Sequence, residues 1–220
     1  MKNIVYKQNY ISLDQVSAIR EYFNKINDSL YASAGPFASV KSKLGWQGCW
    51  DRQLHFEKAD NPIHEIITKL KQDFGEFDYD SNRCSIRYLS APFLPHSDIA
   101  SIKSFKEFRK TGYKEGYIFI IPLWWEKNYR PVTGFFNNPA KLEEPHYSDV
   151  LDIFPEYLET YQEESKNLSV REIIEWQSPG DLIAWENYQW HGSGQIGNFS
   201  YNKESWVKEF ISIETKILIK

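Results

Sequence analysis

The chain has 220 residues, a formal net charge of −4, 16% aromatic residues and two cysteines. This length suits one domain with a complete core, spanning residues 1–220, and the aromatic content excludes a disordered chain. The negative charge gives no basic field for nucleic acid, and two cysteines make neither a disulfide framework nor a zinc motif. We therefore expect a compact cytoplasmic protein in which Cys49 and Cys84 are reduced thiols. The first residues contain no long apolar run, so we expect neither a signal peptide nor a membrane anchor there.

Residues 1–80 predict mainly helical support for the rest of the domain. Ser12 and Gln15 have the spacing of a capping box, and apolar residues at helical spacing follow them. Pro62 is a favourable first residue for a second helix with an apolar stripe, and Gly75 ends that stripe. Because such stripes usually pack in a core, we expect both helices to brace one face of a sheet.

From about residue 82 the sequence changes to a β pattern. The strand candidates are apolar, β-branched or aromatic runs separated by turn residues: 83–89, 116–125, 133–136, 172–176, 181–185 and 206–219. Strands joined by short turns favour a sandwich or barrel, and the jelly roll of cupins belongs to this group. The prediction is a mainly β domain with flanking helices, whose jelly-roll core covers residues 83–215.

Residues 139–170 interrupt this β pattern. They are acidic and aromatic, and residues 150–162 favour a helix. A segment of this length between strands usually covers a site or caps a sheet edge. We expect it to be an insertion or lid.

The strongest candidate for chemistry is a pair of histidines with an aspartate. His96 and Asp98 are separated by one residue, so in an extended segment both side chains face the same side. His191 follows the strand candidate 181–185 after a short loop. Two imidazoles and one carboxylate form the facial triad that binds Fe(II) and leaves positions open for other ligands. Each part is a weak signal alone, because a His-x-Asp pair and a histidine beside glycine are both common.

The residues around these three side chains carry a resemblance to a known family. Three motifs contribute: Tyr88 eight residues before His96-x-Asp98, Ser-Pro-Gly-Asp at residues 178–181 leading into a strand, and His-Gly-Ser-Gly at residues 191–194. Together they resemble the Fe(II)/2-oxoglutarate-dependent dioxygenase superfamily over about residues 83–215, with flanks similar to those of phytanoyl-CoA hydroxylases and prolyl hydroxylases. The resemblance implies a double-stranded β-helix that uses Fe(II), 2-oxoglutarate and O2, with His96, Asp98 and His191 as catalytic metal ligands.

The activity implied by this resemblance is hydroxylation of a C–H bond in a small molecule or an amino-acid side chain, with release of succinate and CO2. Related halogenases have a small residue where Asp98 stands, so the carboxylate favours hydroxylation or desaturation. Two alternatives stay open: a cupin-type metalloenzyme that does not use 2-oxoglutarate, and a non-catalytic jelly-roll binding module. In each case we expect a small-molecule or amino-acid ligand, and neither nucleic acid nor a membrane as partner.

The resemblance also implies a cation for the distal carboxylate of 2-oxoglutarate, on the strand after the distal histidine. No arginine follows His191, which departs from the usual pattern and leaves Lys208 and Lys203. Lys208 lies inside the last strand candidate and is favoured, whereas Lys203 precedes that strand in a Lys-x-Ser spacing. Tyr88 is expected to donate a hydrogen bond to the co-substrate. Arg87 becomes the remaining cation if both lysines point outward.

Candidates for substrate contacts follow the long apolar run 116–125. Trp124 or Trp125 is expected to line a pocket, although strand aromatics more often belong to a core. Arg130 is expected to meet an anionic group of the substrate, and Asn137 to orient the substrate at the end of a strand.

Overall fold

The computed structural model shows helices and antiparallel strands in the part of the chain that it describes. This part comprises residues 4–26, 31–32, 49–79, 84–89, 93–96, 110–127, 131–136, 170–187, 189, 191–193 and 208–218. In chain order the elements are β1 (Ile4–Lys7), α1 (Leu13–Lys25), β2 (Tyr31–Ala32), β3 (Cys49–Gln53), α3 (Ile63–Phe74), β4 (Asp78–Tyr79), β5 (Ser85–Leu89), β6 (Phe93–His96), β7 (Tyr113–Trp125), β8 (Val132–Phe136), β9 (Val170–Glu175), β10 (Leu182–Glu186), β11 (His191–Ser193) and β12 (Lys208–Leu218).

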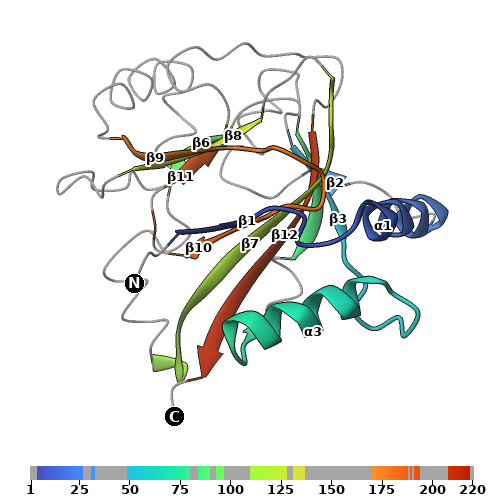
Figure 1. The fold of residues 1–220 in the computed structure, drawn as a ribbon. Helices are drawn as coiled ribbons and strands as arrows, with labels where there is room; N and C mark the ends of the chain where they lie inside the picture. Colours follow the sequence, from blue (N-terminus) through green and yellow to red (C-terminus); the bar gives the residue numbers. More distant parts are fainter. Residues whose placement is uncertain are drawn as a thin grey trace.

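The strands form two sheets that pack as a sandwich. The larger sheet has the order β1-β10-β7-β12-β5-β3-β2, with β4 paired to β12, and the smaller has the order β6-β11-β8-β9. In Figure 1 the smaller sheet lies above the larger one, while α1 and α3 lie on the other side of the larger sheet. Many of the paired strands are distant in sequence, as β12 is from β7 and β5, which is typical of a jelly roll. The predicted mainly β fold with flanking helices is confirmed.

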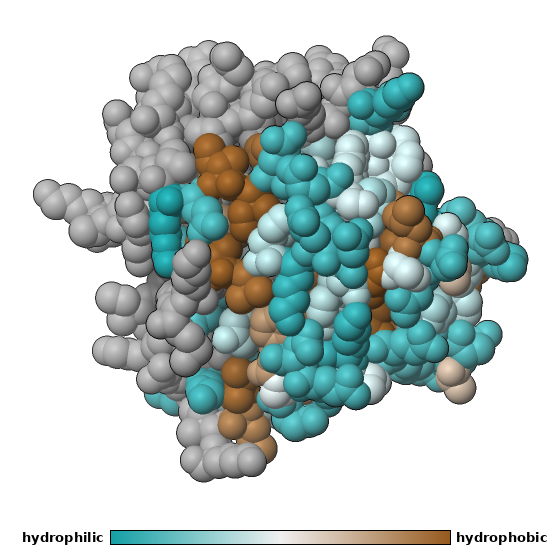
Figure 2. Space-filling model, in the orientation of Figure 1, coloured by the Kyte–Doolittle hydropathy of each residue, from teal (hydrophilic) through white to brown (hydrophobic). Residues whose placement is uncertain are grey.

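Both predicted helices begin and end close to the predicted residues. The Ser12 hydroxyl accepts a hydrogen bond from the Gln15 N–H at 3.2 Å, and the Gln15 side chain accepts one from the Ser12 N–H at 3.0 Å. Helix α3 begins after Pro62 and ends at Gly75, whose φ of 85° favours glycine. The buried residues of each helix recur every three or four positions. The surfaces that α1 and α3 present in Figure 2 are largely hydrophilic.

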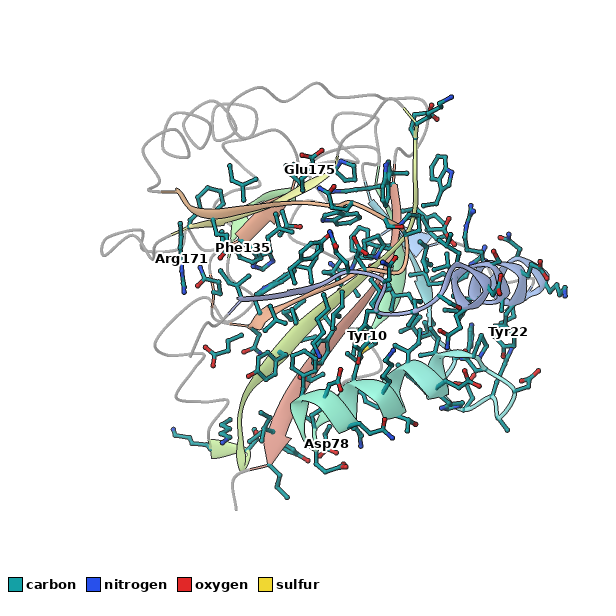
Figure 3. All side chains as sticks on the ribbon, in the orientation of Figure 1. Tyr10, Tyr22, Asp78, Phe135, Arg171 and Glu175 are labelled. Atoms are coloured by element: carbon teal, nitrogen blue, oxygen red, sulfur yellow. The ribbon has the colours of Figure 1, made fainter. Side chains whose placement is uncertain are left out.

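Two hydrophobic clusters join these layers. The helix-side core, between the larger sheet and the helices, includes Phe23 and Phe119. The inter-sheet core, between the two sheets, includes Phe135, Trp176 and Trp185. Figure 3 shows Phe135 pointing into the space between the sheets. Because the larger sheet is covered on both faces, alternate residues of its strands belong to different cores.

The turn predicted at residues 178–181 joins β9 to β10 around a buried carboxylate. Asp181 is 0% exposed and accepts hydrogen bonds from the Tyr6 hydroxyl at 2.6 Å, the Asn9 N–H at 2.9 Å and the Ser178 N–H at 2.9 Å. Burial and the bond to Asp181 raise the pKa of Tyr6 to about 12. The turn therefore ties the start of β10 to β1 and to the loop after it.

The N-terminal 80 residues contribute strands as well as the predicted helices. Strand β1 pairs with β10, with Ile4 opposite Trp185 and Lys7 opposite Leu182, and β3 extends the larger sheet beyond β5. These short strands exist because they complete a sheet whose other strands come from the rest of the chain. The predicted insertion or lid at residues 139–170 lies outside the described residues, apart from Val170, the first residue of β9.

The structure bears on two expectations from composition. Cys84 is a buried thiol, and its Sγ donates to the carbonyl oxygen of Glu214 at 3.8 Å. Within the described ranges, no helix is long and apolar enough to cross a membrane.

The turn at Gly180 yields a stability prediction. Gly180 has a φ of 88°, and a Cβ there would lie 2.4 Å from the carbonyl oxygen of Ile11. Gly75 has a similar φ of 85°, but a Cβ there would meet nothing within 4 Å. We expect Gly75→Ala to lower the free energy of unfolding by about 1–3 kcal/mol through backbone strain, and Gly180→Ala to lower it by about 1–3 kcal/mol more, because the overlap with Ile11 adds to that strain. Urea unfolding of both variants measures this difference, and equal losses would contradict it.

Candidate metal and co-substrate site

The register of the smaller sheet brings two of the three predicted metal ligands together. Position 191, the first residue of β11, lies directly opposite position 96 of β6 and opposite Phe135 of β8. Directly opposed positions of antiparallel strands share one face of the sheet. Two positions far apart in the sequence, each predicted to hold a metal, are therefore neighbours on one face.

The environment of His191 suits a metal ligand. The side chain is 7% exposed, and its ring lies 4.6 Å from the Trp185 ring, between centroids. Its Nδ1 lies 2.9 Å from the carbonyl oxygen of Gln189. Since a carbonyl oxygen only accepts, Nδ1 carries the proton of the neutral ring and Nε2 carries the lone pair. A neutral imidazole with this tautomer has the chemistry of a ligand for Fe(II).

Several predicted site residues lie outside the described part of the chain. These are Asp98, Lys203, Arg130 and Asn137. Among the described residues, no group of three or more His, Cys, Asp or Glu side chains gathers as a metal site. The described side chains do not include the whole predicted triad, so its ligand assignment stays a prediction.

Lys208, the favoured cation for 2-oxoglutarate, lies in the interior between the sheets. It is 0% exposed, and its Nζ lies 5.0 Å from the centroid of the Trp176 ring and 5.9 Å from that of the Phe210 ring. Both aromatic residues belong to the inter-sheet core. The charged group is thus directed toward the same interior that His191 borders.

A short chain of contacts connects Lys208 to His191. The Trp176 ring beside Lys208 donates from Nε1 to the Thr133 hydroxyl at 3.0 Å. Thr133 is two residues before Phe135 in β8, and Phe135 is the register partner of His191. Two residues of strand cover roughly 7 Å. The cation and the histidine therefore border the same interior, between the two sheets.

Tyr88 faces away from this interior, which corrects its predicted role. It belongs to the helix-side core, and the guanidinium of Arg52 lies 5.9 Å from the centroid of its ring. Burial, together with the charge of Glu209, raises the pKa of Tyr88 to about 12, although Arg52 and Arg20 act in the opposite direction. Tyr88 faces the helices because of the strand register. It lies opposite Glu209, which forms an ion pair with Arg20 of α1 at 3.2 Å.

Trp124 also lies on the helix-covered side. The Arg20 guanidinium carbon is 5.9 Å from the centroid of its ring, whereas Trp125 packs against Trp176 at 6.3 Å between centroids. A register shift explains this, because Glu209 pairs with Trp124 but the next residue of β12 pairs with Pro122. The extra residue is a β-bulge, which changes the alternation of side chains. Trp125, and not Trp124, is therefore the tryptophan that faces the inter-sheet core.

Arg87 supplies a second cation on the same face as Lys208. Its register partner in β12 is Phe210 of the inter-sheet core, and its other partner is Asp51 of β3. Arg87 Nε lies 3.5 Å from Asp51 Oδ1, and the arginine side chain is 26% exposed. Lys208 is the more deeply buried of the two cations, so the condition that would make Arg87 the remaining candidate is not met.

Sequence reasoning missed the residues that support the site. Trp176 and Trp185 were expected only as strand residues, and Gln189 was not singled out. The tryptophans close two predicted strands, 172–176 and 181–185, which is the only signal that marks them in the sequence. Gln189 carries no signal beyond its position two residues before His191.

Comparison with known proteins agrees with the fold. Neither family models nor curated proteins match this sequence. Among solved structures, the non-heme α-ketoglutarate-dependent epimerase SnoN from nogalamycin biosynthesis has a TM-score of 0.54 and 9% identity, over 98% of this chain and 77% of its own. The α-ketoglutarate-dependent carbocyclase SnoK from the same biosynthesis has a TM-score of 0.54 and 12% identity, over 98% of this chain and 79% of its own. A Pseudomonas putida prolyl-4-hydroxylase has a TM-score of 0.50 and 8% identity, over 99% of this chain and 93% of its own.

The chain therefore has the jelly-roll fold that these non-haem oxygenase-type enzymes share. This is the fold that the sequence motifs predicted from the resemblance to Fe(II)/2-oxoglutarate-dependent enzymes. The three similar structures are an epimerase, a carbocyclase and a hydroxylase. One fold thus supports several reactions, and the reaction has to be argued from the site.

The face of β12 that carries Glu209 yields a prediction of pH dependence. Burial raises the pKa of Glu209 above its ordinary 4.5, although Arg20 and Arg52 lower it in part. The folded state then binds the proton more tightly than the unfolded state, so stability falls as pH rises from about 4.5 through the raised value. Glu209→Gln cannot ionise and should lack this fall, whose slope reaches at most about 1.4 kcal/mol per pH unit.

Urea unfolding across this pH range measures the effect. The matched control is Glu76→Gln, because the Glu76 side chain is 86% exposed. We expect the curve of the Glu76 variant to run parallel to that of the wild type. A Glu209→Gln curve that is also parallel to the wild type would contradict the assignment.

Proposed function

We propose that this protein is a non-haem Fe(II)- and 2-oxoglutarate-dependent oxygenase that hydroxylates a C–H bond of a small molecule or an amino-acid side chain. The observation that carries the proposal is the register of β11, which places His191 opposite position 96 on a face bordering the interior that holds Lys208. The fold shared with SnoN and SnoK supports it.

The proposed metal ligands are His96, Asp98 and His191. Neutral imidazole nitrogens and a carboxylate oxygen are suitable donors for Fe(II), and three protein ligands leave positions for other groups. When bound, Fe(II) with 2-oxoglutarate and O2 supplies the oxidation, and succinate and CO2 are released. His191 contributes by offering Nε2 while its Nδ1 proton is held by the carbonyl of Gln189. The Trp185 ring packs against its imidazole, with 4.6 Å between the ring centroids.

Lys208 is proposed to hold the distal carboxylate of 2-oxoglutarate. Its ammonium group lies among Trp176 and Phe210, where the effective dielectric constant is lower than in water and attraction for a carboxylate is stronger. Lys203 stays an alternative from outside the described residues. Because Tyr88 faces the helices, it is not assigned a contact with the co-substrate.

The substrate side of the proposal rests mainly on the sequence. Of the two candidate tryptophans, Trp125 is the one on the interior face. Arg130 and Asn137 keep their proposed roles in binding an anionic group and in orienting the substrate. Hydroxylation is preferred over halogenation because Asp98 provides a carboxylate, and the insertion at residues 139–170 is proposed to close over the substrate.

Metal binding gives the first test. We expect His96→Ala, Asp98→Ala and His191→Ala each to weaken anaerobic binding of Fe(II) by about 100-fold or more, because each removes one of three ligands. His64→Ala is the control, since His64 lies in α3 beyond the larger sheet. Isothermal titration measures the affinities. Wild-type binding in all three variants would refute the ligand set.

Co-substrate binding gives the second test. Lys208→Met should weaken 2-oxoglutarate binding to the iron-loaded protein by about 2–4 kcal/mol, or roughly 30- to 1000-fold, because a buried charge partner is lost. Lys216→Met on the same strand is the matched control, since its Nζ lies over Tyr113 at the other end of β12. Unchanged binding in Lys208→Met would remove Lys208 from the site. An iron-loaded wild type that fails to bind 2-oxoglutarate would favour a cupin-type metalloenzyme instead.

A further inference from the structure

We propose that Gln189 is a positioning residue that holds His191 in the tautomer and orientation needed to bind a metal. This inference rests on the proposed function, because it concerns the support of one proposed ligand. It assigns a role to a side chain that does not itself reach the metal.

The first step is the contact between Gln189 and the imidazole. The backbone carbonyl oxygen of Gln189 lies 2.9 Å from His191 Nδ1. A carbonyl can only accept, so its position decides that Nδ1 is protonated and that Nε2 keeps the lone pair. If this carbonyl turned away, the protonation of Nδ1 would lose its support and both tautomers would be populated.

The second step is the side chain that fixes this carbonyl. Gln189 is 7% exposed. Its Nε2 donates to the carbonyl oxygen of Phe136 at 2.7 Å, and its Oε1 accepts from Arg171 at 2.8 Å. Phe136 adjoins Phe135, which lies directly opposite His191. The side chain therefore ties residue 189 to the strand that also sets the position of His191.

The backbone and the side chain of Gln189 are both held by hydrogen bonds. The N–H of Gln189 donates to the carbonyl oxygen of Glu186 at 2.8 Å. Backbone N–H, backbone carbonyl, amide nitrogen and amide oxygen of Gln189 thus all take part in hydrogen bonds to four different residues. A residue attached in four directions has little freedom to rotate, so its carbonyl is presented to His191 in one orientation.

Arg171 links this arrangement to the edge of the smaller sheet. It lies on β9, the last strand in the order of that sheet, and Figure 3 shows its side chain extending from this strand. Its guanidinium donates to the Gln189 amide oxygen and so selects the amide orientation in which Nε2 faces Phe136. Arg171 is expected to assist Gln189 and to have the smaller effect when replaced.

The test begins without metal. Protein labelled with ¹⁵N-histidine reports the tautomer of each of the five histidines, and His191→Ala identifies the signal of His191. We expect the wild type to show His191 with a proton on Nδ1, and Gln189→Met to show a mixture of tautomers. A Gln189→Met spectrum in which His191 keeps one tautomer with a protonated Nδ1 would overturn the inference whether or not the site binds metal.

The second arm titrates the same variants with Co(II) and records the visible absorption of the bound ion. Supporting partners of metal-binding histidines typically contribute about 10- to 100-fold to metal affinity, so Gln189→Met should weaken Co(II) binding by that factor. Gln189→Glu keeps the acceptor for Arg171 and loses the donor to Phe136, so its affinity should lie between Gln189→Met and the wild type. Arg171→Met should show a smaller loss than Gln189→Met.

The control is Gln177→Met. Gln177 is exposed, and its Nε2 donates to a nearby carbonyl, that of Glu175, at 3.2 Å. Co(II) affinity should equal that of the wild type in this variant. Equal affinity in Gln189→Met, Gln189→Glu and Arg171→Met as well would overturn the inference and leave the proposed metal site standing. Failure of the wild type to bind Co(II) would instead count against the proposed function. If Gln189→Met does not fold, the Gln189→Glu and Arg171→Met variants decide the matter.

Discussion

Strand β12 is buried on both faces, and this constraint decides which side chains can reach the site. Its residues from Lys208 to Ile213 are all buried, with β7 on one side and β5 on the other. Lys208 and Phe210 face the smaller sheet, whereas Glu209 faces α1 and pairs with Arg20. A register slip of one residue would exchange the two charges, placing the carboxylate where the ammonium group now lies.

The proposed histidine ligands and the proposed cation for the co-substrate come from different sheets. The smaller sheet carries position 96 and His191, which register makes neighbours. The larger sheet carries Lys208. The Trp176 ring lies beside the Lys208 ammonium group, and its Nε1 donates to the hydroxyl of Thr133 in the smaller sheet. Burying an ammonium group is costly, and the two aromatic rings near Lys208 contribute to offsetting that cost.

Much of the fold was predictable because its signals are local. The capping box at Ser12, the end of α3 at Gly75 and the turn before Asp181 each depend on a few adjacent residues, and each is present in the structure. The sequence left the direction of Lys208 open, because the side chains of a strand alternate between two faces; the structure buries it. The pairing of position 96 with His191 agreed with the motif, although neither position alone is a specific signal.

The errors arose where long-range pairing overrides local pattern. Strand β1 has four residues, too few to show an alternation, and it forms because β10 offers an edge. The sequence left Trp124 and Trp125 as alternatives, and the bulge opposite Glu209, which changes the alternation within β7, decides that Trp125 faces the inter-sheet core. Tyr88 was assigned to the co-substrate from motif position alone, but its register partner Glu209 belongs to the helix-covered face. A bulge and a register are properties of two strands, and one strand's sequence does not contain them.

In the proposed site, one interior holds both the metal and the co-substrate, with His191 on one sheet and Lys208 on the other. The most direct measurement is a crystal structure of the protein prepared without oxygen and with Fe(II) and 2-oxoglutarate. We expect iron bound by His96, Asp98 and His191, and the distal carboxylate of 2-oxoglutarate on the Lys208 ammonium group. Iron bound elsewhere, or a distal carboxylate held by Arg87 with Lys208 uninvolved, would contradict it.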